Sequence, residues 1–247
     1  MYRKPEVLVM DAGRGQSVYF RLPGNGGVLV DAGSSWSGRE ISSHLTTRGV
    51  DSVETVIFTH PDRAHIEGYS FLSEKYSPKQ IIVSTSDMSH DIYSDLTPDP
   101  LHVEAGDQFQ KGGWRIEVLH PPETTSFRSA DDRSLVLRFT HQFKSILVLG
   151  GAGADVQKTI VDRGSEISST ILLAGHPRRG PLFEPEFLDS VSPQITVFAG
   201  RGFEGVNEQR KRAESIVNLS GIRVLRVPDG GVLDLQPQKR TILSVRK

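Results

Sequence analysis

The residues best suited to chemistry lie in one short segment, residues 59–65 (THPDRAH). His60, Asp62 and His65 supply two imidazoles and a carboxylate, a ligand set suited to Zn²⁺, Mn²⁺ or Fe²⁺. The apolar run 55–58 (TVIF) comes directly before them, and a strand end that opens into a turn can project several side chains into one cavity. His and Asp also cap turns and satisfy backbone groups. At this point a metal site and a purely structural turn are both open interpretations.

No other short motif points to a different chemistry. The glycines of residues 11–15 complete neither a GxGxxG fingerprint nor a Gly-Lys-Ser/Thr phosphate loop, and the chain has no GxSxG nucleophile elbow. Zero cysteines exclude disulfides, thiolate metal sites and a cysteine nucleophile. The 29 basic and 30 acidic residues exclude a strongly basic nucleic-acid footprint, although a local basic patch is compatible with them.

The remaining ionisable residues have weaker signals. Arg178 and Arg179 could contact a phosphate, although adjacent loop arginines are often simply solvated. Residues 210–212 (RKR) are expected on the solvated face of a helix, opposite its apolar face. Four histidines without ligand spacing are expected at the surface or in turns: His44, His90, His102 and His141.

The elements that must position these residues alternate between strands and helices. The runs 7–10, 17–22 and 27–30 are separated by Gly, Pro and Asn, which predicts a β-meander. Further strands are expected at 55–59, 80–84, 114–119, 134–139, 145–149, 170–173, 195–198, 223–227, 231–235 and 241–245. Helices are expected from Ser34 or Ser35 as the cap to Leu45, at 69–75, 155–162 and 184–191, and from Asn207. Two mixed sheets packed face to face, with helices outside, would bury these apolar faces in one domain over residues 1–247.

Taken in order, the motifs resemble the metallo-β-lactamase fold, and most of all the C-terminal domain of ComEC-type DNA-uptake (competence) proteins. The resemblance runs from about Val7 to Leu235 and implies an α/β (α+β) fold, a four-layer αββα sandwich. The segments that carry it are Asp11–Gln16 (DxGxGD-like), Asp31–Gly33 (DAG), Thr59–His65 (THxDxDH-like), Leu119–Pro122 (LHPP), Asp131–Val136 (NDxSLV-like), Gly150-Gly151 (for Gly-Asp), His176–Arg179 (for HHGS) and Pro185–Leu188 (PEFL).

The resemblance also implies a chemistry and a set of site residues. A two-metal hydrolase of this kind cleaves phosphodiesters with a metal-bound hydroxide. Carried over position by position, the metal ligands are His60, Asp62, His65 and His176. Asp132 aligns with a site position and is the candidate catalytic residue that orients a ligand or water. Capping the turn before Ser134 is the structural alternative for Asp132, and His120 is expected to be architectural.

Several positions depart from the family pattern. Ala64 and Gly151 stand where the family has metal-binding carboxylates, Pro177 replaces a histidine and Gln16 an acidic residue, and residues 201–206 contain no histidine. Two divalent cations a few ångströms apart repel strongly unless carboxylates and hydroxide lie between them. We therefore expect no two-metal centre. One divalent metal, Zn or Mn, on His60, Asp62 and either His176 or His65 is one alternative; no metal at all is the other.

These observations favour a ComEC-like domain linked to DNA uptake, with a degraded metal site and absent or impaired phosphodiesterase activity, in effect a pseudoenzyme. An active single-metal hydrolase is the first alternative, and an anion-binding or partner-binding scaffold that uses Arg178 and Arg179 is the second. DNA or the DNA-uptake machinery is the expected partner. No apolar run of about 18 residues occurs. We expect a soluble domain, part of or associated with a membrane DNA-uptake protein, in a compartment that the sequence leaves open.

Overall fold

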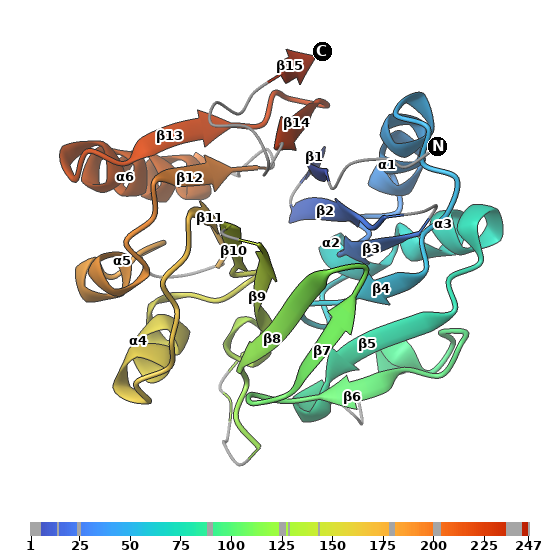
Figure 1. The fold of residues 1–247 in the computed structure, drawn as a ribbon, viewed down its shortest axis with the longest axis horizontal. Coiled ribbons are helices and arrows are strands. Elements are labelled where there is room, and N and C mark those ends of the chain that lie inside the picture. The colour runs from blue at the N-terminus through green and yellow to red at the C-terminus, as the bar shows by residue number, and fades with distance from the viewer. Residues whose placement is uncertain are drawn as a thin grey trace.

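Two β-sheets face each other, and helices cover the outer side of each one (Figure 1). The computed structural model describes residues 6–246 except 14, 24–25, 88–90, 124–126, 128, 143, 178–180, 200–203 and 236–243. The layers are helix, sheet, sheet and helix, as the sequence predicts. The fold is therefore the expected four-layer αββα sandwich.

The first sheet contains eight strands, and it combines the N-terminal meander with a parallel half. Strands β1, β2 and β3 are antiparallel, whereas β3 to β6 run parallel. In spatial order the strands are β15 (Ser244–Arg246), β14 (Val232–Leu235), β1 (Val7–Ala12), β2 (Gly15–Arg21), β3 (Gly27–Val30), β4 (Thr55–Ile57), β5 (Gln80–Ser84) and β6 (Leu101–Val103). The outer face is covered by α1 (Ser37–Thr47), α2 (Arg63–Ile66) and α3 (Tyr69–Tyr76).

The second sheet contains seven strands, with an antiparallel half followed by a parallel half. In spatial order they are β13 (Arg223–Arg226), β12 (Ile195–Phe198), β11 (Ile171–Leu173), β10 (Lys144–Val148), β9 (Val136–His141), β8 (Trp114–His120) and β7 (Gln108–Lys111). Helices α4 (Ala154–Asp162), α5 (Pro185–Val191) and α6 (Glu204–Leu219) pack outside it. Three short 3₁₀ turns complete the elements: η1 (Thr85–Asp87), η2 (Asp91–Tyr93) and η3 (Asp131–Arg133).

Side-chain alternation along the strands fills both faces of each sheet. On β2, Val18 and Phe20 point between the sheets, and Tyr19 points toward the helices. Phe20 stacks on Phe139 of the opposite sheet with ring centroids 3.7 Å apart, and Trp114 meets Phe20 edge-on at 5.3 Å. Because both faces are covered, the central strands are almost continuously apolar.

The ends of strands from both sheets meet at one edge of the sandwich. Thr59, just after β4, accepts a hydrogen bond at its carbonyl oxygen from the backbone N–H of Leu135, just before β9, at 2.6 Å. Gly150, just after β10, has a positive φ of 58°, and a Cβ there would lie 2.7 Å from the Cβ of Thr59. The absence of a side chain at Gly150 therefore lets the two sheets approach closely at this edge.

The elements that the sequence analysis missed are short. β6 and β7 are edge strands, and Phe109 is the single apolar residue of β7, so alternation gives little signal there. α2 is four residues long, too short for a helical period, and begins where the Asp62 side chain accepts from the Ala64 N–H. α6 begins at Glu204, three residues before the expected Asn207.

The expected cap of the first helix was wrong. α1 begins at Ser37 with Trp36 at the N-cap position, and no side-chain cap forms. The Ser37 N–H instead donates to the carbonyl oxygen of Ser34 at 2.9 Å. The chain therefore enters α1 through a backbone turn, and the Trp36 side chain is left at the surface.

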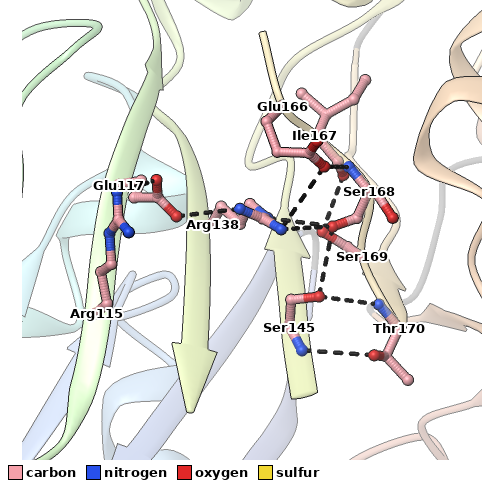
Figure 2. Close-up of polar contacts among 9 residues, drawn as sticks. All are labelled: Arg115, Glu117, Arg138, Ser145, Glu166, Ile167, Ser168, Ser169 and Thr170. Atoms are coloured by element: carbon pink, nitrogen blue, oxygen red, sulfur yellow. Dashed lines mark hydrogen bonds and ion pairs between the residues drawn. The ribbon is translucent and has the colours of Figure 1, made fainter. Parts of the chain in front are cut away.

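A polar network crosses the outer face of the second sheet, from β8 to the segment before β11 (Figure 2). Arg138 on β9 donates to Glu117 on β8 at 3.2 Å and, through two nitrogens, to the carbonyl oxygen of Ser168 at 3.2 and 2.9 Å. Ser145 and Thr170 exchange two further hydrogen bonds beside it. The Arg138 side chain is 16% exposed, so it fastens the segment before β11 to the sheet.

We predict that Arg138→Met lowers the free energy of unfolding by about 1–3 kcal/mol, because methionine keeps the apolar stem and loses the hydrogen bonds. Arg115→Met is the matched control, since Arg115 is 52% exposed and pairs with the same Glu117, and exposed pairs contribute about 0–1 kcal/mol. Urea unfolding of both variants measures the difference. Equal losses in the two variants would contradict the assigned role of Arg138.

Candidate functional site

The buried carboxylate of Asp31 organises the edge where the strand ends meet. Asp31 follows β3 in a left-handed conformation with φ of 61°, and its N–H donates to the Ile57 carbonyl oxygen at 2.9 Å. Its Oδ1 accepts the Thr59 N–H at 2.8 Å. Its Oδ2 accepts both the Thr59 hydroxyl and His65 Nδ1, each at 2.8 Å. One fully buried carboxylate therefore joins the ends of β3 and β4 to α2.

These contacts fix the tautomers of two histidines. A carboxylate only accepts, so His65 Nδ1 carries a proton. The Thr59 hydroxyl gives its one proton to Asp31, so it accepts from His60 Nδ1 at 3.1 Å. In the neutral rings the lone pair is then on Nε2, the arrangement that a carboxylate imposes on metal-binding histidines. The two rings lie side by side with centroids 4.1 Å apart.

The ring of His60 lies directly against Gly151. A Cβ placed on Gly151 would be 2.8 Å from His60 Cε1, 3.0 Å from His60 Nε2 and 2.8 Å from the Ser134 hydroxyl oxygen. The Gly151 N–H donates to that hydroxyl at 3.1 Å. Any side chain at position 151 would therefore displace His60 or Ser134.

Asp62 and Asp132, both expected in the site, have other contacts in the structure. Asp62 is half-buried, and its Oδ1 accepts the Ala64 N–H at 2.8 Å as the cap of α2. Asp132 is half-buried on η3, and its N–H donates to the Ser129 hydroxyl at 3.2 Å. The neighbouring Asp131, which the sequence analysis did not select, has its Oδ1 3.9 Å from His60 Nε2.

His176 reaches the same edge from the end of β11. Its N–H donates to the Gly150 carbonyl oxygen at 2.9 Å, and its Nε2 donates to the carbonyl oxygen of Ala199. Its Nδ1 is buried and has no hydrogen-bond partner among the described residues. Burial lowers the pKa of His176 to about 4, so the ring is neutral at pH 7.

The expectation that residues 210–212 all lie on a solvated helix face is wrong for Arg210. Arg210 on α6 is half-buried and donates from Nη2 to the carbonyl oxygen of Ala199 at 2.7 Å, beside His176. Burial lowers its pKa. Lys211 and Arg212 are exposed, as expected. The helix turns the first member of the run toward the strand ends, because Ala213 and Val217 face the core on the same side.

Other histidines have structural places. His141 is 8% exposed and lies against Trp114 with ring centroids 5.1 Å apart, so the surface expectation was wrong for it. His120 is buried, and its Nδ1 donates to the Ser134 carbonyl oxygen at 3.0 Å. Burial lowers the pKa of His120 to about 4. His90, Arg178, Arg179 and residues 200–203, for which the sequence made predictions, lie outside the described residues.

The donor set does not fit a two-metal centre. Ala64 and Gly151 offer no side-chain donor, and the ring of His60 lies where a side chain at position 151 would begin. Gln16 is buried, and neither atom of its amide has a hydrogen-bond partner in the described part of the chain. Across the described residues, no three His, Cys, Asp or Glu side chains form a group that could hold a metal ion. His60 and His65 are together, while Asp62 caps a helix.

Two competence proteins are similar to this chain in sequence at low identity. The chain is 21% identical over 259 residues to ComE operon protein 3 of Bacillus subtilis, covering 95% of this chain and 33% of that protein. It is 26% identical over 231 residues to competence protein ComA of Neisseria gonorrhoeae, covering 92% and 31%. The chain thus spans about a third of the length of these relatives. No family model matches it.

Solved structures agree at low sequence identity. The metallo-β-lactamase fold protein YhfI from Bacillus subtilis superposes with a TM-score of 0.65 at 14% identity, over 94% of this chain and 100% of that one. Zn²⁺-bound PqqB from Methylobacterium extorquens superposes with a TM-score of 0.58 at 11% identity, over 90% and 97%. This chain therefore has the metallo-β-lactamase fold. Within the described residues, no helix has both the length and the apolar character needed to cross a membrane.

We predict that Asp31→Asn destabilises the fold by about 3 kcal/mol. The three groups that face this carboxylate are all donors, so an amide NH₂ would confront one of them and leave it unsatisfied. Asp132→Asn, on half-buried η3, is the control and should change stability by less than about 0.5 kcal/mol. Urea unfolding followed by circular dichroism compares the two, and a stability of Asp31→Asn equal to wild type would refute the central role of this carboxylate.

We also predict a loss of stability on acidification that depends on His120. Its folded pKa of about 4 lies below the ordinary 6.5, so the unfolded chain takes up the proton first. The contribution of His120 to stability is complete above pH 6.5 and is lost as the pH falls from 6.5 to 4, by at most about 3 kcal/mol. In His120→Asn, which keeps a donor toward Ser134, unfolding curves at several pH values should show a shallower fall. His102→Asn is the control, and a slope unchanged in His120→Asn would oppose the assignment.

Proposed function

We propose that this chain is a competence-linked metallo-β-lactamase-fold domain in which a degraded metal site leaves phosphodiesterase activity absent or impaired. The similarity to ComE operon protein 3 and to ComA supports the link to competence. Its role is then to bind DNA or a component of the DNA-uptake machinery.

One observation carries the proposal: the packing of His60 on Gly151. A bridging carboxylate at position 151 would need the space that the His60 ring and the Ser134 hydroxyl take up. Ala64 removes the other acidic ligand from the same segment. Two divalent ions close together require such negative ligands to offset their repulsion. The absence of both carboxylates, together with the tight packing of His60, supports a site that no longer performs two-metal hydrolysis.

The same edge keeps its structural frame. Asp31, Thr59 and His65 remain joined by hydrogen bonds. These contacts hold strand ends from one sheet to α2, so they support the fold whether or not an ion is present. A domain that keeps this fold but lacks two of the carboxylates that would coordinate metal ions is suited to binding rather than to hydrolysis.

The test is hydrolysis of bis(p-nitrophenyl) phosphate and of end-labelled single-stranded and duplex DNA, with Mn²⁺ or Zn²⁺ added. We expect the wild-type rate to equal that of His60→Ala. His102→Ala, at a half-buried histidine outside the site, controls for preparation effects.

Metal-dependent cleavage by wild type and His102→Ala that disappears in His60→Ala would overturn the proposal. It would identify this edge as the site of an active metal-dependent hydrolase instead. Equal background rates in all three proteins, each folded by circular dichroism, would support the proposal.

A further inference from the structure

The indole of Trp36 lies on the surface, in the loop that leads from the end of β3 to α1. Trp36 is 89% exposed, whereas Trp114, the other tryptophan of the chain, is fully buried. Trp36 stands between Asp31, which organises the site, and the first turn of α1. Loop 31–38 is joined to α2, because the Ala32 N–H donates to the carbonyl oxygen of His65 at 2.7 Å. The exposed ring is therefore presented by a well-anchored segment.

Cations and aromatic rings continue from Trp36 across α1 and α3, which lie side by side (Figure 1). Arg39 is three residues after Trp36, so the two share a face of the helix start. The Arg39 guanidinium lies 5.5 Å from the centroid of the Phe71 ring on α3. Lys75, one turn after Phe71, has its Nζ 5.3 Å from the Tyr76 ring centroid.

Lys75 also ties the two helices together. Its Nζ donates to the Ser42 hydroxyl of α1 at 3.1 Å and to the Thr46 hydroxyl. From Trp36 to Thr46 the helix rise gives about 15 Å. We call the residues Trp36, Arg39, Phe71 and Lys75 the α1–α3 stripe.

The charges of the stripe are available to an anion. Among the residues that the structure describes, neither Arg39 nor Lys75 forms an ion pair with a carboxylate; their contacts are with rings and hydroxyls. Arg63 on nearby α2 differs, since its Nε lies 3.6 Å from Glu67. Flat groups that alternate with cations are the features by which proteins hold single-stranded nucleic acid: bases stack on the rings and phosphates meet the cations.

We propose that the α1–α3 stripe binds single-stranded DNA, with a base stacked on Trp36 and phosphates at Arg39 and Lys75. The choice of DNA rests on the proposed function. The binding itself needs no metal and no residue among His60, His65 and His176.

The two tryptophans make the test direct, because Trp36 is the solvent-exposed fluorophore. The probe is a dye-labelled oligo(dT), titrated into the full chain in EDTA at low salt. We expect quenching of tryptophan emission and binding by fluorescence anisotropy that weakens as salt rises. Trp36→Ala should weaken binding by about tenfold, and Trp36→Phe should restore most of it. Leu219→Ala, which removes an 88% exposed side chain from α6, should bind as wild type does.

Three results would overturn the proposal. Trp36→Ala could bind as tightly as wild type, or oligo(dT) could bind without changing the emission of Trp36. Anionic phosphatidylglycerol vesicles could quench Trp36 where oligo(dT) does not, which would assign the stripe to a membrane surface. Because the titration is done in EDTA, cleavage of DNA in the Mn²⁺ assay would overturn the proposed function and leave the stripe intact.

Discussion

Hydrogen bonding to the Asp31 carboxylate is the interaction on which this edge of the molecule depends. The carboxylate accepts hydrogen bonds from the backbone N–H and the hydroxyl of Thr59 and from the ring of His65. The Asp31 backbone is in a left-handed conformation. A fully buried carboxylate is costly unless it is fully hydrogen-bonded, and here all three donors belong to Thr59 and His65 of the segment that follows β4. The same contacts set the tautomers of His60 and His65. Fold and site geometry therefore share one origin.

Two of the departures from the family pattern place small residues, Ala64 and Gly151, at this edge. Gly151 leaves room for the His60 ring and for the Ser134 hydroxyl. Ala64 leaves the start of α2 with Asp62 as its cap and no second carboxylate. His176 is held by Ala199, to which Arg210 also donates. The imidazoles remain in place while the acids that would neutralise two ions are missing, which is the basis of the proposed binding role.

The sequence predicted most of the fold because order and alternation are long-range signals. The meander, the hairpin of β9 and β10, and the parallel strands all follow from apolar runs and turn residues. Strand β7 was not predicted, because its single apolar residue gives no alternation of apolar and polar side chains. Site details depended on side-chain geometry: motif position could not tell that Asp131, rather than Asp132, faces His60. The sequence identified Asp31 as part of a DAG motif but not its role. Its hydrogen bonds form only when the fold brings β3, β4 and α2 together.

We propose that this edge of the sandwich does not hold two metal ions. Nondenaturing mass spectrometry of the full chain, titrated with Mn²⁺ or Zn²⁺ and compared with His60→Ala, counts bound ions per molecule directly. We expect no more than one specifically bound ion per chain at every metal concentration. Two ions bound to the wild type and lost together in His60→Ala would contradict it.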